Sequence, residues 1–201
     1  ALPAGCRVAP LSAVLANDAP AVERVLASAA EAKTRPFVAL DSALFSDGAF
    51  VELAAGTTLD LPVHAIYVQT DAGAPVASHF RTLISAGAGS RGLVVEQHSG
   101  DTQKQDVTNA VTEIRVGQGA VLDHVLVQDL PDSSSVFTAV LTRQDAHSRL
   151  GLHSLALGAS LARAEFESRL EGEGAELALD GLYLGRGVHF PIAMEGALKL
   201  K

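Results

Sequence analysis

A strand unit punctuated by short glycine-rich or polar turns returns four times along this chain at nearly constant spacing. The first apolar residues of the units are Leu93, Val121, Leu150 and Leu177, so the steps are 28, 29 and 27 (121−93, 150−121 and 177−150). A fixed period of this length is typical of stacked units that cannot bury an apolar face alone. We therefore expect a solenoid. The turns that precede the units are Gly87-Ala88-Gly89-Ser90, Gly117-Gln118-Gly119, Asp145-Ala146-His147 and Gly172-Glu173-Gly174.

Residues 110–116 show how the units are built. Ala110, Thr112, Ile114 and Val116 alternate with Val111, Glu113 and Arg115, which predicts a strand with two different faces. Each unit has room for two or three such strands. Simple hairpins need fewer residues, and parallel β/α units need helical patterns between the strands. The spacing therefore favours a mainly β fold, a right-handed parallel β-helix.

The composition is that of a globular chain and excludes several classes of function. Of 201 residues, 48% are hydrophobic, 19% are charged and 4% are aromatic, with no Trp, which suits thin stacked layers of small aliphatic side chains. The net charge of −8 argues against nucleic acid as a partner. Cys6 is the single cysteine, so no internal disulfide forms. The apolar runs are shorter than the roughly 20 residues of a membrane helix, so we expect no membrane contact.

The chain divides into three regions. Residues 1–35 are predicted to be helical, because Leu11, Val14 and Leu15 have the spacing of one helix face. We expect Pro36 to end the helical region and a strand pattern to begin near Phe37. Residues 36–187 form the expected β-helix core. Residues 188–201 continue neither pattern and are interpreted as an atypical tail.

The repeat predicts one column of polar residues, three positions after the start of each unit. The column contains Glu96, His124, His153 and Asp180. Two imidazoles flanked by two carboxylates could bind a divalent metal. The alternative is a ladder of polar groups on an outer sheet face, bonded to one another and to water. We favour the ladder, and accordingly predict no metal-binding residue here.

The remaining polar motifs are interpreted as structural, so no catalytic or cofactor-binding residue is predicted. Gly87-x-Gly89 has neither the helix nor the Lys of a phosphate loop. The other candidates stand without an acid, base or ligand partner in the sequence: His64, His79, Glu171, Glu173 and the loop serines Ser133, Ser134 and Ser135.

Several strings, taken in order and spacing, resemble the SufB/SufD family of the SUF iron–sulfur cluster assembly system. The resemblance covers nearly everything from Leu2 to Gly187 and is nearer to the SufD branch. SufB typically carries a Glu-Gly-Cys motif where this chain has Glu96-Gln97-His98. The strings are Pro36-Phe37-Val38-Ala39-Leu40, Asp47-Gly48-Ala49-Phe50, Asn109 to Ile114, Gly119 to His124, Ser148 to Gly158, Gly172 to Ala175 and Gly181 to Leu184.

The resemblance implies a right-handed parallel β-helix after an N-terminal helical region. It implies a cytoplasmic scaffold subunit, not an enzyme, that contacts a SufB-like subunit laterally and works with a SufC-like ATPase. A homodimer through the β-helix is a further expectation. The full complex would handle iron–sulfur clusters, while this chain alone is expected to hold no cofactor.

The family pattern fades after Gly187, so we interpret the chain as a fragment that lacks the C-terminal half and the SufC docking region. No cluster-binding residue is therefore carried over from the family. The alternative function is a β-helix enzyme acting on polysaccharide or acyl substrates. Its only candidate residues are those of the Glu96–Asp180 column.

Overall fold

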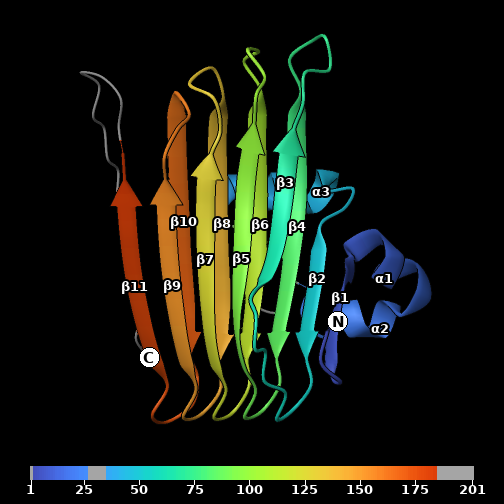
Figure 1. Ribbon diagram of the computed structural model, residues 1–201, viewed down its shortest axis with the longest axis vertical. Coiled ribbons are helices and arrows are strands. Elements are labelled where there is room, and N and C mark those ends of the chain that lie inside the picture. Colours follow the sequence, from blue (N-terminus) through green and yellow to red (C-terminus); the bar gives the residue numbers. More distant parts are fainter. Residues whose placement is uncertain (1, 27–34, 185–201) are drawn as a thin grey trace.

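A computed structural model describes residues 2–26 and 35–184 of the chain as two facing β-sheets with three short helices (Figure 1). The expected tail, residues 188–201, lies outside the described residues. The elements are β1 (Cys6–Pro10), α1 (Leu11–Asn17), α2 (Ala19–Glu23), α3 (Pro36–Leu44), β2 (Ala49–Leu53), β3 (Val63–Gln69), β4 (Ala77–Ala86), β5 (Arg91–Gly100), β6 (Val107–Val116), β7 (Val121–Asp129), β8 (Ser135–Gln144), β9 (Arg149–Ala156), β10 (Leu161–Leu170) and β11 (Glu176–Tyr183).

The chain winds between the two sheets, placing one strand of each turn in either sheet. Sheet A has the order β1-β2-β4-β6-β8-β10, and sheet B has the order β11-β9-β7-β5-β3. All pairs are parallel except β1 with β2. The result is a mainly β solenoid of about four turns. The predicted fold class is therefore confirmed, with two strands in each turn.

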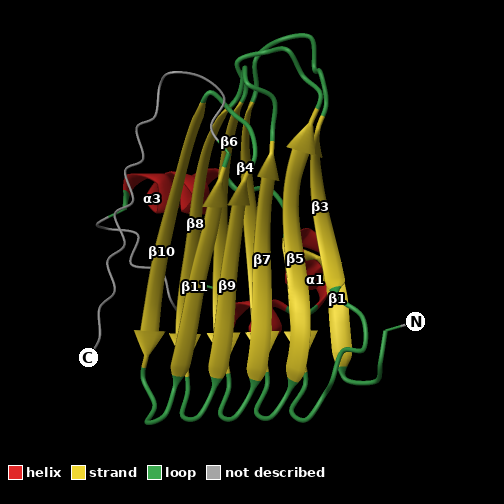
Figure 2. Ribbon diagram, turned by 60° about the vertical axis from the view of Figure 1, so that its left-hand side comes forward, coloured by secondary structure: helices red, strands yellow, loops and turns green. Residues whose placement is uncertain are grey.

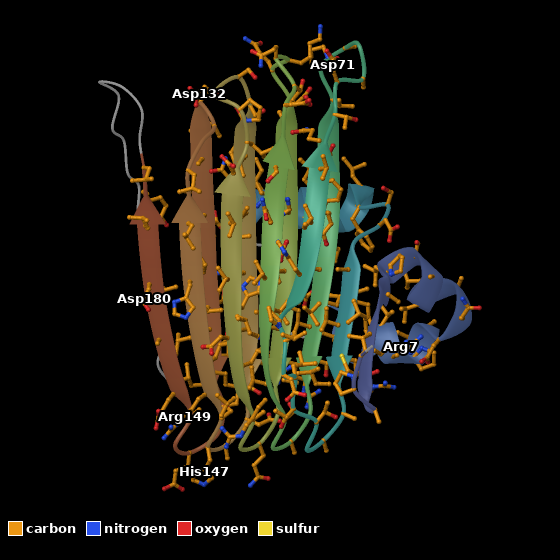
Figure 3. The ribbon with its side chains drawn as sticks, viewed as in Figure 1. Arg7, Asp71, Asp132, His147, Arg149 and Asp180 are labelled. Carbon is orange, nitrogen blue, oxygen red and sulfur yellow. The ribbon has the colours of Figure 1, made fainter. Side chains whose placement is uncertain are left out.

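The predicted turns stack at one end of the solenoid, opposite the longer loops that contain Asp71 and Asp132 (Figures 2 and 3). Their third residues all have positive φ, a conformation that favours glycine: Gly89, Gly119, His147 and Gly174. Neighbouring turns are also joined by backbone hydrogen bonds, such as Gly89 N–H to the Gln118 carbonyl.

Strand register follows these turns. Arg91 of β5 pairs with Val121 of β7, Val121 with Arg149 of β9, and Arg149 with Glu176 of β11. The true steps in residue number are therefore 30, 28 and 27 (121−91, 149−121 and 176−149). The first two steps predicted from Leu93, Val121 and Leu150 were wrong, because apolar residues occupy both faces of these strands. The step from Leu150 to Leu177 was right.

The core lies between the sheets and is built from small aliphatic side chains. The alternation predicted for β6 is confirmed. Ile114 and Val116 point into this core, while Val111 points outward from sheet A and packs under α3. The main interior cluster is Val51, Val63, Ile84, Ala86, Val94, Ile114, Val116, Ala120, Leu122, Leu126, Val140, Leu150 and Leu152.

The described helices lie against sheet A. Leu11 of α1 and Val22 of α2 pack on Phe50 and Leu83 of the sheet. The prediction of strand from Phe37 onward was wrong, because residues 36–44 form α3. Pro36 occupies the first turn of that helix, where proline is favoured, and so begins a helix instead of ending one.

Candidate functional site

The predicted column of Glu96, His124, His153 and Asp180 is divided between the two faces of sheet B. His124 pairs with Leu152, and Glu96 pairs with Leu126, so neither is level with His153. The His124 side chain is buried between the sheets, while that of His153 is 36% exposed on the outer face. The prediction of one column was therefore wrong, and the metal site considered for it is excluded. Only His153 and Asp180 are in register.

The inward-facing half of that set forms a closed polar cluster. Glu96 and His98 lie two residues apart on β5 and share its inner face, and His124 reaches them from β7. One oxygen of Glu96 lies 3.0 Å from His98 Nε2, and the other accepts a hydrogen bond of 2.7 Å from Thr112 Oγ1. His124 Nε2 lies 3.4 Å from this second oxygen. The carboxylate therefore has partners on three strands of both sheets.

The hydrogen bonds decide the ionisation of Glu96. Burial alone would raise its pKa, but the hydrogen bonds from His124 and His98 and their charge hold the pKa well below the ordinary range. Burial raises the pKa of the neighbouring Tyr67, and the charge of Glu96 adds to the rise. Tyr67 also stacks on the His98 ring, with centroids 4.8 Å apart, and bonds Thr82 through its hydroxyl. The carboxylate of Glu96 is fully engaged inside the solenoid, whereas Nδ1 of His98 has no hydrogen-bond partner among the described residues.

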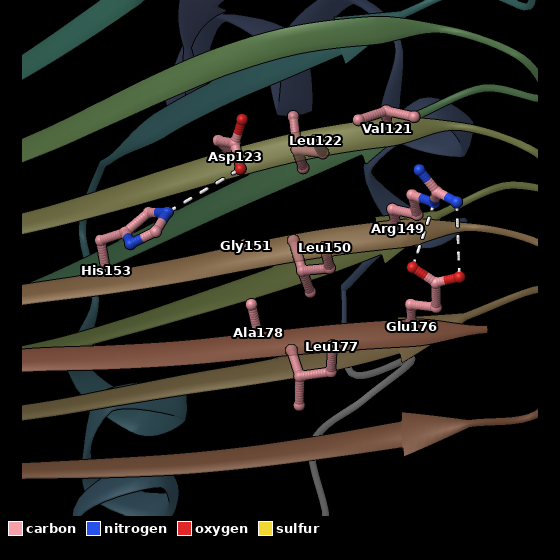
Figure 4. A pocket seen from close by; sticks show the side chains of 10 residues that line it. All are labelled: Val121, Leu122, Asp123, Arg149, Leu150, Gly151, His153, Glu176, Leu177 and Ala178. Carbon is pink, nitrogen blue, oxygen red and sulfur yellow. Dashed lines mark hydrogen bonds and ion pairs between the residues drawn. The ribbon is translucent and has the colours of Figure 1, made fainter.

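Of the outward-facing half, His153 lines a shallow cavity of about 310 Å³ on sheet B (Figure 4). His153 of β9 lies between two carboxylates, 3.8 Å from Asp123 and 3.3 Å from Asp180. At the other end of the cavity Arg149 pairs with Glu176 at 3.1 Å. These charges are largely exposed, so each pair contributes little to stability. This matches the polar ladder that the sequence analysis favoured, although only for this part of the column.

The other sequence candidates lie apart. His64 is exposed and bonds Gln97, His79 lies near Asn109, and Glu171 pairs with Arg143 in the turn region. The sequence analysis missed His98, although its position two residues after Glu96 placed both on one strand face. It also missed the buried Arg81, which a sequence does not distinguish from a surface arginine.

The chemistry that these groups can perform is limited by access. Glu96, His98 and His124 are each at most 1% exposed, so a substrate has no route to them in this conformation. Within residues 2–26 and 35–184, no three His, Cys, Asp or Glu side chains are grouped as ligands for a metal ion. Nor is any helix in that part of the chain long and apolar enough to cross a bilayer.

Comparison with protein families agrees with this architecture. The family model "SUF system FeS cluster assembly, SufBD core domain" matches residues 67–190, more than half of the chain. A comparison with curated proteins gave no match. The matched residues include β4 to β11, the regular parallel part of the solenoid. The chain belongs to the SufBD core-domain family of the SUF iron–sulfur cluster assembly system.

Proposed function

We propose that this chain is part of a SufD-type scaffold subunit, acting with a SufB-like subunit and a SufC-like ATPase in the cytoplasm. The observation that carries the proposal is the match to the SufBD core domain over residues 67–190, where the parallel solenoid is most regular. A rigid stack of parallel strands suits a subunit that positions partners.

The SufD assignment is supported by the residues around Glu96. The Glu-Gly-Cys motif typical of SufB is replaced by Glu96-Gln97-His98. His98 is engaged with Glu96 and Tyr67 inside the solenoid. The single cysteine, Cys6, lies instead on β1, so the interior has no thiolate to carry sulfur or hold a cluster. A supporting subunit fits these residues better than a cluster-carrying one.

A non-enzymatic role is supported by the division of the candidate column. A β-helix hydrolase or acyltransferase needs its acid and base on one accessible face. Here Glu96 is enclosed between the sheets, while Asp180 is exposed on the opposite face. The enzyme alternative thereby loses the only constellation that the sequence offered for it.

The outer face of sheet B is our proposed surface for the SufB-like subunit. The described helices contact sheet A, so within residues 2–26 and 35–184 no helix covers this face (Figure 1). Apolar side chains run across it in register, and their exposure is typical of interaction surfaces. The row is Ile66, Val127, Leu155 and Leu182, interrupted by Gln97.

Co-purification tests this proposal. The natural full-length protein, tagged and co-expressed with SufB and SufC from the same source, is expected to retain both. Ile66→Glu on the uncovered face should weaken SufB retention. Leu15→Glu on α1 should not; both side chains are partly exposed, at 54% and 39%. Failure to retain either partner would refute the scaffold role. Equal retention by the two variants would refute the location.

A further inference from the structure

Helix α3 is held on sheet A by an unusual group of buried charges. Arg81 of β4 is 1% exposed, and it faces Asp41 of α3 and Glu113 of β6, both fully buried. The Arg81 guanidinium lies 3.4 Å from the Asp41 carboxylate and 3.8 Å from that of Glu113. One cation therefore serves two carboxylates at a helix–sheet joint.

Hydrogen bonding within this group is incomplete on both the helix and the strand side. Arg81 donates to Ser42 Oγ at 2.6 Å, and Ser42 in turn donates to the Val38 carbonyl. Among the described residues, neither carboxylate oxygen of Asp41 has a hydrogen-bond partner, and neither do Nε and Nη1 of Arg81. A buried carboxylate without hydrogen bonds strongly disfavours its charged form.

The surroundings of Asp41 favour its protonated form. Burial raises the pKa of Asp41 to about 7, with Arg81 opposing the rise and Glu113 adding to it. The aromatic ring of Phe45 lies 5.7 Å from the Arg81 guanidinium. The side chains that cluster with Val38 beneath α3 are apolar: Val111 of β6 and Ala139 and Leu141 of β8. None of these apolar side chains compensates a charge on Asp41, so Arg81 alone opposes the effect of burial.

Two further charged or titratable groups connect the start of α3 to sheet A. His79 of β4 contacts Asn109 of β6, which donates to the Phe37 carbonyl in the first turn of the helix. Arg35, just before the helix, pairs with Glu165 and Glu167 of β10. Both groups act at the start of α3, so a test of Asp41 needs a variant that changes Asp41 alone.

We propose that Asp41, Arg81 and Glu113 form a pH-sensitive latch that holds α3 on sheet A when Asp41 is protonated and loosens it when Asp41 ionises. The docked helix keeps a proton that an undocked, solvated Asp41 gives up at ordinary acidic pH. Docking therefore weakens as the pH rises toward 7 and changes no further above it. Loosening α3 uncovers the apolar patch of Val111, Ala139 and Leu141.

The coupling between the protonation of Asp41 and the docking of α3 has a defined direction and a maximum size. Between the solution pKa of an aspartate, about 4, and the raised value, each pH unit changes the docking equilibrium by at most about tenfold. The ion pairs of Arg35 tie the N-terminal side of the helix separately. The latch therefore acts on the body of the helix.

Hydrogen exchange of the 201-residue chain between pH 5 and 8.5 tests the latch. Protection factors, referred to the intrinsic rate at each pH, should fall for amides of residues 39–45 by up to about tenfold per pH unit until about pH 7. Amides of β9 serve as the internal control and should change much less. Asp41→Asn should remove the dependence on pH. Glu113→Gln should move the fall to lower pH, because it removes the repulsion that raises the pKa of Asp41.

Three outcomes would overturn the latch. They are constant protection of α3 across this range, a parallel fall in β9, and an unchanged fall in Asp41→Asn, which would assign the titration to His79 or another group. If Asp41→Asn does not fold, the wild-type profile and Glu113→Gln decide between the same outcomes. The measurement requires no partner protein, so its result is independent of the scaffold proposal.

Discussion

Glu96 and Asp41 are two fully buried carboxylates whose environments drive ionisation in opposite directions. The pKa of Glu96 is held low by the hydrogen bonds of His124 and His98 despite its burial. The pKa of Asp41 is raised to about 7 by burial, and neither of its oxygens accepts a hydrogen bond from the part of the chain that the structure describes. Equal burial therefore gives opposite outcomes, and the number of hydrogen bonds to the carboxylate decides between them.

The difference reflects where each group sits. Glu96 lies between two sheets whose register is fixed by continuous backbone ladders, so its partners are placed precisely. Asp41 lies on a short helix that rests on the outside of sheet A, where side-chain contacts, including the hydrogen bond from Arg81 to Ser42, set its distance to Arg81 and no backbone ladder does. The contacts of Glu96 are thus fixed by the strand register of the solenoid, whereas the contact between α3 and sheet A can change.

Replacing each carboxylate by the corresponding amide should give the largest difference in stability between the two sites. Glu96→Gln replaces an acceptor of three hydrogen bonds and places an amide donor against donors, so it should destabilise the fold by about 3 kcal/mol. Asp41→Asn should cost less than about 1 kcal/mol at pH 8, since it removes an unsatisfied charge. Urea unfolding at pH 8 measures both. Equal costs would contradict the comparison.

The pH dependence of stability should come from Asp41 and not from Glu96. Asp41 has a folded pKa above its unfolded value, so its contribution is complete below about pH 4 and is lost as the pH rises to about 7. The slope should reach at most about 1.4 kcal/mol per pH unit. Glu96, with a lowered pKa, is ionised in both states above about pH 5 and adds no slope there.

Urea unfolding at pH 5, 6, 7 and 8 measures this slope. Asp41→Asn should flatten it, and Asp180→Asn on the exposed face should leave it unchanged. A slope that persists in Asp41→Asn would assign the titration to another group.

Removing one of the hydrogen bonds to Glu96 should make the environment of this carboxylate more like that of Asp41. Thr112→Val deletes the 2.7 Å hydrogen bond and should cost about 1 kcal/mol while raising the pKa of Glu96. Thr108→Val is the matched control on the same face of β6, because its bond to Gln69 is already long at 3.5 Å. Thermal unfolding compares the two. A larger loss in Thr108→Val would contradict the assigned role of Thr112.

Removing the exposed ion pairs on sheet B should change the stability least. His153→Ala removes both carboxylate contacts of this imidazole, and we expect a change of at most about 0.5 kcal/mol because solvent screens them. Chemical denaturation at low and high salt measures the change. A loss as large as that expected for Glu96→Gln would mean that His153 belongs with the buried group, contrary to its position on the outer face.

The sequence predicted the solenoid, its turns and the two faces of β6, because these depend on local chemistry and on a period of two. It did not predict the register, because apolar residues lie on both faces of sheet B. The spacing of the turns indicates the correct register. Their third residues, Gly89, Gly119, His147 and Gly174, are separated by the true steps of 30, 28 and 27 (119−89, 147−119 and 174−147).

The candidate site was less predictable than the fold. Aligning the chain on the turns would have placed Glu96 and His153 on opposite faces and thereby removed the column. The contact of Asp41 with Arg81 joins two positions far apart in the sequence through the docking of a helix, and no local pattern encodes it.

Carboxyl carbon NMR of the labelled chain, followed from pH 3 to pH 9, tests the central comparison most directly. The side-chain resonance of Asp41 should titrate near pH 7, and that of Glu96 should not titrate anywhere in the range. Asp41→Asn and Glu96→Gln assign the two signals. If Glu96 titrates near neutral pH, or if Asp41 remains ionised down to pH 4, hydrogen bonding does not separate these two buried carboxylates.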